Sequence, residues 1–184
     1  MQRELADRCN TSQPRVSQVL VRLAADDLVH RTDTGWVGGR ERLITTYLDR
    51  YRPRQTEPEA WWYALDTLVE QAQRLVSVRD DVAVSADLAT DLTMPWRRPS
   101  TIIVWATEPI DLSTLGFVHA ESRAAATLIV RVTDDARLFN DSAMVDGLRL
   151  AGRFQQATDL LDLGGTDRIE AVSVLMGISS GMLG

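Results

Sequence analysis

The first third of the chain carries polar and basic side chains of types that could contact nucleic acid. Arginine and glutamine donate hydrogen bonds to bases or phosphates, serine and threonine contact phosphates, and valine can touch a thymine methyl group. The candidate DNA contacts between residues 12 and 22 are Ser12, Gln13, Arg15, Ser17, Gln18, Val21 and Arg22. Arg31, Thr32 and Thr34 follow closely and are expected to reach the adjacent backbone or the minor groove.

A helix is predicted to position the first set of these side chains. Apolar residues recur in it at i, i+3, i+4 and i+7, the spacing of one buried stripe. The stripe consists of Val16, Val19, Leu20 and Leu23. Ser12 is a good N-cap, and Pro14 costs little in the first turn, where the missing N–H has no helical partner.

The neighbouring segments are expected to complete a DNA-binding module. A short helix is predicted from Glu4 to Cys9, with Cys9 as a small buried side chain. Strands are predicted at 28–31 and 36–37, joined by a turn at 32–35. Helix, tight turn, helix and hairpin is the order of a helix-turn-helix with a wing.

A winged helix-turn-helix usually has one more helix before this pair, so about one helix is expected to be missing at the N-terminus. The segment Glu41–Tyr51 is the expected internal cover for Leu5, Val19 and Leu23. An apolar side chain that stays exposed lacks the stabilisation of about 1.5–3 kcal/mol that its burial would contribute. We therefore expect a module of reduced stability.

Charge divides the chain into two parts. All 20 basic residues are arginine, and with 26 acidic residues the net charge is −6. Residues 1–54 hold 10 arginines against 7 acids (+3), and residues 55–184 hold 10 against 19 (−9). A basic end on an acidic body suggests that only one end meets a polyanion.

The length and the polar stretch at 50–58 fit two blocks. A chain of 184 residues is one domain, or one domain with a small module. We assign 1–52 to a partial winged helix-turn-helix module and 53–184 to a second domain. A single cysteine excludes an intramolecular disulfide framework, and without a long apolar run or a leader we expect a cytoplasmic protein with no membrane partner.

The second block is predicted to be α+β, a small mixed sheet with helices on its faces. A long helix is expected to begin at Pro58, with Trp61 and Trp62 as core or interface anchors. The expected strands are 82–84, 101–106, 117–119, 127–133 and 144–150, with 101–106 at the centre, 117–119 at an edge and a bulge or turn at Asp146-Gly147. The other expected helices are 85–92, capped by Ser85, and 153–163 and 167–176.

The sequence predicts no catalytic residue, no metal site and no cofactor. His30 and His119 lack matched partners, and the acid pairs at 80–81 and 134–135 have the character of turn residues. The order strand, helix, loop, strand over 82–106 is like the start of a nucleotidyltransferase fold, but the glycine-serine loop and the metal-binding carboxylates are absent there. Arg97 and Arg98 in that loop are candidate contacts for a phosphate or an acidic partner.

Patterns along nearly the whole chain resemble those of the AbiEi-type antitoxins of type IV toxin–antitoxin systems and their helix-turn-helix relatives. The segments that carry the resemblance are Gln2–Ala6, Val16–Leu20 with the hairpin, Ser85–Ala89, Thr101–Ala106, Thr127–Thr133 and Gln155–Leu163. The resemblance implies a protein that binds the inverted repeats of its own promoter, represses it and counters a nucleotidyltransferase-like toxin.

Two other functions stay open. The first is a ligand-responsive transcriptional regulator without a toxin, which requires a concave apolar pocket with a few polar groups. The second is a catalytically degenerate nucleotidyltransferase-like protein, which requires carboxylates gathered at one edge of the sheet.

Overall fold

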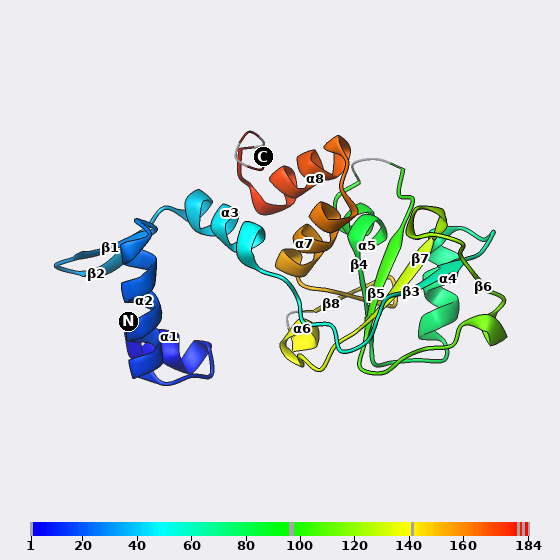
Figure 1. Cartoon of the computed structure of the whole chain (residues 1–184), viewed down its shortest axis with the longest axis horizontal. Coiled ribbons are helices and arrows are strands. Elements are labelled where there is room, and N and C mark those ends of the chain that lie inside the picture. The colour runs from blue at the N-terminus through cyan, green and yellow to red at the C-terminus, as the bar shows by residue number, and fades with distance from the viewer. Residues whose placement is uncertain (1, 96–97, 141, 180, 182, 184) are drawn as a thin grey trace. The chain divides into compact units, whose positions relative to one another are not determined.

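The computed structural model divides the chain into two units, Met1–Arg50 and Tyr51–Gly184 (Figure 1). It describes residues 2–95, 98–140, 142–179, 181 and 183. The division lies close to the predicted boundary at 52/53. Each unit is described below by itself.

Unit 1 contains three helices and a hairpin among its described residues. They are α1 (Gln2–Arg8), α2 (Gln13–Ala25), β1 (Val29–Thr32), β2 (Gly35–Gly38) and α3 (Arg40–Arg50). Asn10 makes the turn between α1 and α2 in the left-handed region (φ 45°), which asparagine tolerates well. Ser12 caps α2 as predicted, since its hydroxyl accepts a hydrogen bond from the Arg15 N–H at 3.4 Å.

A small apolar cluster holds unit 1 together. Its buried members are Ala6, Val16, Leu20 and Val29, and the partly buried side chains around it include Leu5, Leu23, Trp36 and Leu43. Leu43 comes from α3, so α3 does cover part of this cluster, as expected for the segment 41–51.

Two predictions about burial in unit 1 are wrong. Val19, predicted to face inward, is 41% exposed, because it lies at the edge of the apolar stripe. Cys9, predicted to be buried, is exposed, because α1 ends at Arg8 and Cys9 lies in the turn beyond it.

Unit 2 is built on a mixed sheet of seven strands in the order β6-β3-β7-β5-β4-β9-β8. The strands are β3 (Ala60–Tyr63), β4 (Val82–Ser85), β5 (Ile102–Ala106), β6 (Val118–His119), β7 (Leu128–Val132), β8 (Ala143–Val145) and β9 (Leu148–Leu150). Strand β5 lies at the centre, antiparallel to β4 and parallel to β7, and all its residues are buried, as predicted for the apolar run 101–106. The edge strands β6 and β8 are only 2 and 3 residues long.

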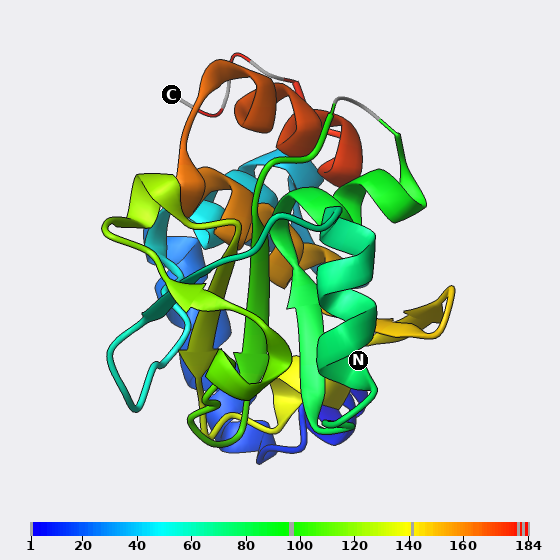
Figure 2. The ribbon, with the colours of Figure 1, turned by 90° about the vertical axis from the view of Figure 1, so that its right-hand side faces the viewer.

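Helices cover both faces of this sheet (Figures 1 and 2). The helices of unit 2 are α4 (Leu68–Val76), α5 (Ala86–Thr93), α6 (Arg137–Asn140), α7 (Arg153–Leu163) and α8 (Thr166–Met176), with 3-10 turns η1 (Ser113–Leu115) and η2 (Arg123–Ala125). Gly164 ends α7, and Asp146 and Gly147 make the tight turn between β8 and β9 with φ of 49° and 80°, both as predicted. Unit 2 is therefore α+β with a mixed sheet.

The long helix predicted from Pro58 is wrong in its first half. Residues 60–63 form β3, which pairs with β7 and β6, and α4 begins only at Leu68. The alternation of a strand sends Trp62, 2% exposed, into one core cluster and Trp61 to the other. A capping box between Thr67 and Glu70 fixes the true start of α4.

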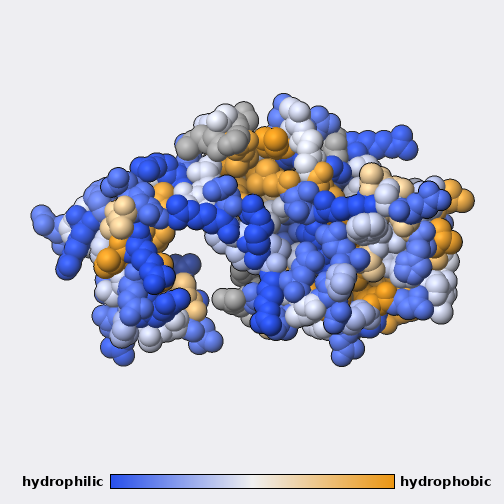
Figure 3. Space-filling view, viewed as in Figure 1, coloured by the Kyte–Doolittle hydropathy of each residue, from blue (hydrophilic) through white to orange (hydrophobic). Residues whose placement is uncertain are grey.

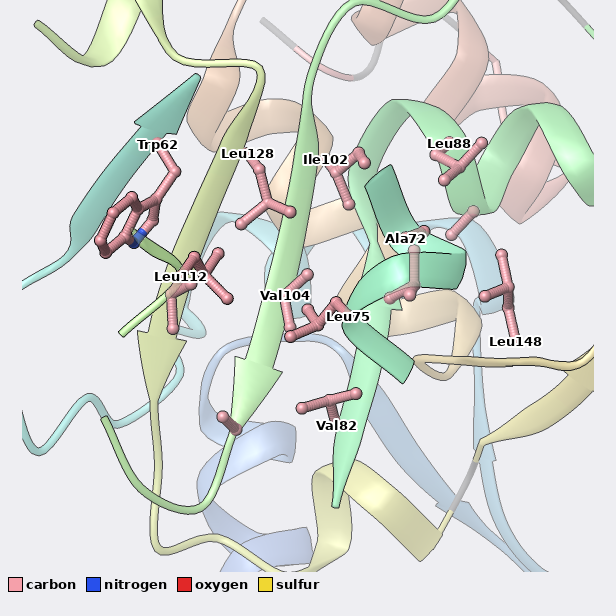
Figure 4. Packing of buried hydrophobic residues seen from close by; sticks show 14 of the residues in the cluster. Trp62, Ala72, Leu75, Val82, Leu88, Ile102, Val104, Leu112, Leu128 and Leu148 are labelled. Carbon is pink, nitrogen blue, oxygen red and sulfur yellow. The ribbon is translucent and has the colours of Figure 1, made fainter. Parts of the chain in front are cut away.

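Alternate residues of the central strands supply the two cores. Val82, Ile102, Val104 and Leu128 meet Ala72 and Leu75 of α4 on one face (Figure 4). On the other face Ala83, Ile103, Trp105 and Ile129 form a second cluster, with Leu163 of α7 packed against it. Since successive residues of a strand point to opposite faces, this near-continuous apolar pattern is what a doubly covered strand requires.

Substitution of Gly38 tests the packing of the hairpin against α3. A Cβ there would lie 2.8 Å from the Leu28 carbonyl oxygen and 2.9 Å from Leu43 Cδ1, so Gly38→Ala forces the two elements apart. We expect a loss of about 1–3 kcal/mol in the stability of unit 1, measured by hydrogen exchange of α2 and β1 amides. At the neighbouring Gly39 a Cβ meets nothing closer than 3.9 Å, so Gly39→Ser should leave exchange unchanged or slower. Equal protection in Gly38→Ala and the unaltered protein would contradict this account of the packing.

Candidate nucleic-acid interface

One side of α2 is exposed and carries most of the predicted DNA contacts. Val16 and Leu20 are each 8% exposed and lie in the core of unit 1. At about 100° per residue, the opposite side of the helix is centred on Gln18. Exposed side chains on or next to this side include Arg15, Gln18, Val21 and Arg22. Ser12 and Gln13 are exposed at the start of the helix but lie well away from this side, and Ser17 is half-buried. We refer to Arg15, Gln18, Val21 and Arg22 as the α2 face.

The charges of the α2 face are not neutralised from within the unit. Helix α2 has two arginines and no acidic residue along its 13 residues. Among the residues that the structure describes, none forms an ion pair with Arg15 or Arg22. In Figure 3 the surface of unit 1 turned to the viewer is mostly hydrophilic, with only small apolar spots. A positive, open helix face is the arrangement that phosphate and base contacts need.

Arginines of α3 behave differently, because they hold the end of α2. Arg42 Nη1 donates to the Asp27 carbonyl oxygen at 2.9 Å, and Arg50 Nη1 lies 2.7 Å from Asp26 Oδ2. The pairing with Asp26 raises the pKa of Arg50, first through the hydrogen bond and then through charge. The carboxylate of Asp26 and the backbone carbonyl of Asp27 are therefore engaged with α3, at the end of α2 remote from Arg15.

The hairpin presents one arginine beside a tight turn. Strands β1 and β2 pair antiparallel, with Thr32 opposite Gly35, so that Asp33 and Thr34 form the tip. The Thr32 hydroxyl donates to the Gly35 carbonyl oxygen at 3.0 Å and lies 3.2 Å from that of Thr34. Arg31 and Thr34 are exposed, while the half-buried Thr32 is committed to the turn.

The charge of unit 1 is smaller than that of residues 1–54. Unit 1 holds 8 arginines against 7 acids, a balance of +1, because Arg52 and Arg54 belong to unit 2. Arg54 there pairs with Asp134 at 3.1 Å. The positive character of the candidate site is therefore local to α2, since Asp33 balances Arg31 in the hairpin, and it does not extend over the whole unit.

The second candidate contact, the loop after α5, is only partly described. Arg97 lies outside the described residues. Arg98 is exposed.

Unit 2 contains a buried charge cluster that was not predicted from the sequence. Arg131 on β7 is 2% exposed and meets three carboxylates. Its Nη1 lies 2.7 Å from Asp159 Oδ1, its Nη2 lies 2.6 Å from Glu59 Oε1, and it also pairs with Asp162. Arg123 adds a second guanidinium next to Glu59 and Asp162. We call these five residues the Arg131 cluster.

Asp159 is the most enclosed member of the cluster. It is 0% exposed, and its Oδ2 accepts hydrogen bonds from Trp105 Nε1 at 2.8 Å and from Ser85 Oγ at 2.5 Å. Burial raises the pKa of Asp159, and Arg131 and the hydrogen-bond donors oppose that shift. Ser85 does occupy the N-cap of α5 but makes no side-chain cap bond, because its hydroxyl is used by Asp159. The prediction of a capping serine is therefore correct in position and wrong in partner.

One sequence signal pointed to this cluster. Arg131 is the only charged residue in the otherwise apolar strand Leu128–Val132. A charge inside a doubly covered strand requires a buried partner, since an unpaired ion in the interior is very costly. The identity of that partner depends on the fold, because Asp159 is 28 residues away along the chain and Glu59 is 72 away.

The histidines and carboxylates give no metal site in the described ranges. No three or more His, Cys, Asp or Glu side chains are grouped there to hold a metal ion. His30 is exposed, and the His119 ring stacks on Trp62 with 4.0 Å between centroids. In the part of the chain that the structure describes, no helix has the length and apolar character to cross a membrane.

Replacing Arg131 tests whether the cluster stabilises unit 2. Arg131→Met removes the cation and leaves Asp159 buried without its ionic partner, so we expect a loss of about 3–5 kcal/mol in unfolding free energy. Urea unfolding followed by tryptophan fluorescence measures it, since Trp105 is fully buried beside the cluster. The control is Arg54→Met, which breaks the exposed pair with Asp134 and should cost at most about 1 kcal/mol. Similar losses in both variants would argue against a stabilising role for the cluster.

The lowered pKa of Asp81 predicts how the stability of unit 2 falls in acid. Hydrogen bonds from Arg79 Nε at 2.7 Å and from Thr107 Oγ1 at 2.5 Å hold the pKa of Asp81 well below its usual value. A depressed pKa gives stability that is present above the unfolded value of about 3.9 and is lost as the pH falls toward the folded one. Asp81→Asn should therefore lower stability at pH 7 and flatten its decline between about pH 5 and 3 in thermal unfolding. Arg79→Met should flatten it as well, and a curve parallel to that of the unaltered protein in both variants would refute the assignment.

Comparison of the chain with protein families, with curated proteins and with solved structures found no match. The case for a function therefore depends on the geometry of the chain's own residues.

Proposed function

We propose that the protein is a DNA-binding transcriptional regulator, with unit 1 acting as a winged helix-turn-helix and the α2 face entering the major groove. The observation that carries the proposal is the α2 face itself, an exposed, acid-free helix side whose two arginines have no ionic partner among the described residues. Amphipathic helices with a solvated polar face are common, but their surface arginines are usually interspersed with acids.

The dimensions of unit 1 support this proposal. A helix of 13 residues is about 20 Å long and fits the major groove, which is about 12 Å wide. Arg15, Gln18 and Arg22 are of the types that donate to base edges and phosphates. The hairpin follows α2 directly and exposes Arg31 and Thr34, which we assign to the neighbouring backbone or minor groove.

The negative charge of unit 2 supports assigning the DNA contacts to unit 1. Residues 51–184 hold 12 arginines against 19 acids, a balance of −7, which disfavours contact with phosphates. The prominent buried arginine of unit 2, Arg131, is surrounded by carboxylates. We therefore assign DNA binding to unit 1 alone.

The resemblance to AbiEi-type antitoxins extends the proposal to the role of unit 2. On that basis the protein binds the inverted repeats of its own promoter and counters a nucleotidyltransferase-like toxin. Expression of a neighbouring nucleotidyltransferase-like reading frame with and without this chain tests that role by growth. Growth arrest that this chain does not relieve would favour the alternative, a regulator without a toxin.

The Arg131 cluster bears on the third alternative, a degenerate nucleotidyltransferase. Glu59, Asp159 and Asp162 each pair with the guanidinium of Arg131. In the described ranges they do not form a group that could hold a metal ion. This supports a non-catalytic role, and incorporation of labelled nucleotides with Mg²⁺ would overturn it.

Arg22→Ala tests the placement of α2 in the groove. A phosphate contact releases condensed counterions, so its loss should reduce the slope of log affinity against log salt by about 1 and weaken binding about ten-fold. The measurement is fluorescence anisotropy of the full chain with a duplex from its own promoter, between about 50 and 200 mM salt.

Arg153→Ala is the matched control, because it removes one exposed arginine from unit 2. It should leave the affinity and the salt slope unchanged. An unchanged slope with unchanged affinity in Arg22→Ala would exclude α2 as the helix in the groove.

A further inference from the structure

The centre of the α2 face combines two side chains of different chemistry. Gln18 and Val21 are three residues apart, so they are neighbours on the helix surface. Gln18 is exposed, and Val21 is 59% exposed, although the core of unit 1 has Val16 and Leu20 on the same helix. The hydrophobic core therefore does not explain why position 21 is apolar.

The two side chains match the two members of an A·T pair. In the major groove a glutamine amide can bind adenine through N6 and N7. The thymine methyl is an apolar group on the floor of that groove, and an apolar side chain is its complement. Glutamine and valine do not form matching contacts of this kind with guanine or cytosine.

The rest of α2 is consistent with this preference. Cytosine is read through its amino group by aspartate or glutamate, and α2 contains neither. Arg15 lies three residues before Gln18 and Arg22 four residues after it, so the arginines flank the pair along the helix. Arginine in those places supplies affinity at both ends, through phosphates or guanines.

We propose that α2 selects duplexes in which an adenine and a thymine methyl lie together at the middle of the recognised half-site, with Gln18 reading the adenine and Val21 the methyl group. The inference rests on the proposed function, because it requires α2 to lie in the major groove. It adds the base preference of the site and the residues that set it.

Substitution of single atoms in the DNA tests this preference. The full chain is used to select duplexes from a library with 20 random base pairs, and the preferred duplex is then altered one base at a time. Uracil in place of thymine removes only the methyl group, and 7-deaza-adenine in place of adenine removes only the N7 acceptor. We expect one uracil position and one 7-deaza-adenine position, within adjacent base pairs, each to weaken binding about three- to ten-fold.

Three protein variants assign those losses to residues. Val21→Ala removes two methyl groups, so it should bind more weakly and respond less to that uracil, and Gln18→Ala should no longer respond to that 7-deaza-adenine. Val19→Ala is the matched control, since Val19 is also exposed, at 41%, but lies at the edge of the buried stripe. It should keep the full response to both. All three positions are at the surface, and circular dichroism confirms that each variant is folded.

The outcomes separate this inference from the proposed function. Selection of duplexes without a shared A·T pair, or a uracil response that is undiminished in Val21→Ala, would overturn the base preference while leaving DNA binding intact. Failure to bind any duplex would overturn the proposed function and this inference with it.

Discussion

Burial of Val16 and Leu20 against Ala6 and Val29 is the constraint on which the rest of unit 1 depends. A helix can bury only one stripe in so small a unit, and fixing that stripe fixes the opposite side as the one available to a partner. The turn at Asn10 and the cap at Ser12 set where α2 begins, and so decide which residues fall on which side. The exposed positions of Gln18 and Arg22 follow from these apolar contacts.

The described arginines that matter most in each unit differ in burial and pairing. In unit 2, Arg131 and Arg168 are largely buried and are held by carboxylates, with Arg168 joined to Asp87 at 2.8 Å. In unit 1, α2 presents its arginines to solvent, and Arg50 of α3 pairs with Asp26, the first acid after the helix. Arginine thus orders the interior of unit 2 and gives α2 of unit 1 an open positive face.

Much of the fold and of the candidate site could be predicted from local sequence, because short-range signals determine them. The cap at Ser12, the glycine end of α7 and the apolar run of β5 each lie within a few residues of their effect. The errors in unit 2 arose where distant contacts decide. β3 is a strand because it pairs with β7, and Ser85 turns from its helix to Asp159, 74 residues away. No local pattern contains that information.

The edge strands of the sheet in unit 2 affect whether copies of the chain aggregate in solution. A long, flat edge strand exposes a row of free backbone groups on which another molecule can build, and this is a common route to aggregates. Here β6 offers 2 residues after the turn at Gly116, and β8 offers 3 residues before the turn at Asp146 and Gly147. So short an edge gives an incoming strand too few hydrogen bonds to start a continuous ribbon. Concentrated solutions of the folded chain should therefore resist fibril growth, even though the sheet is open at both sides.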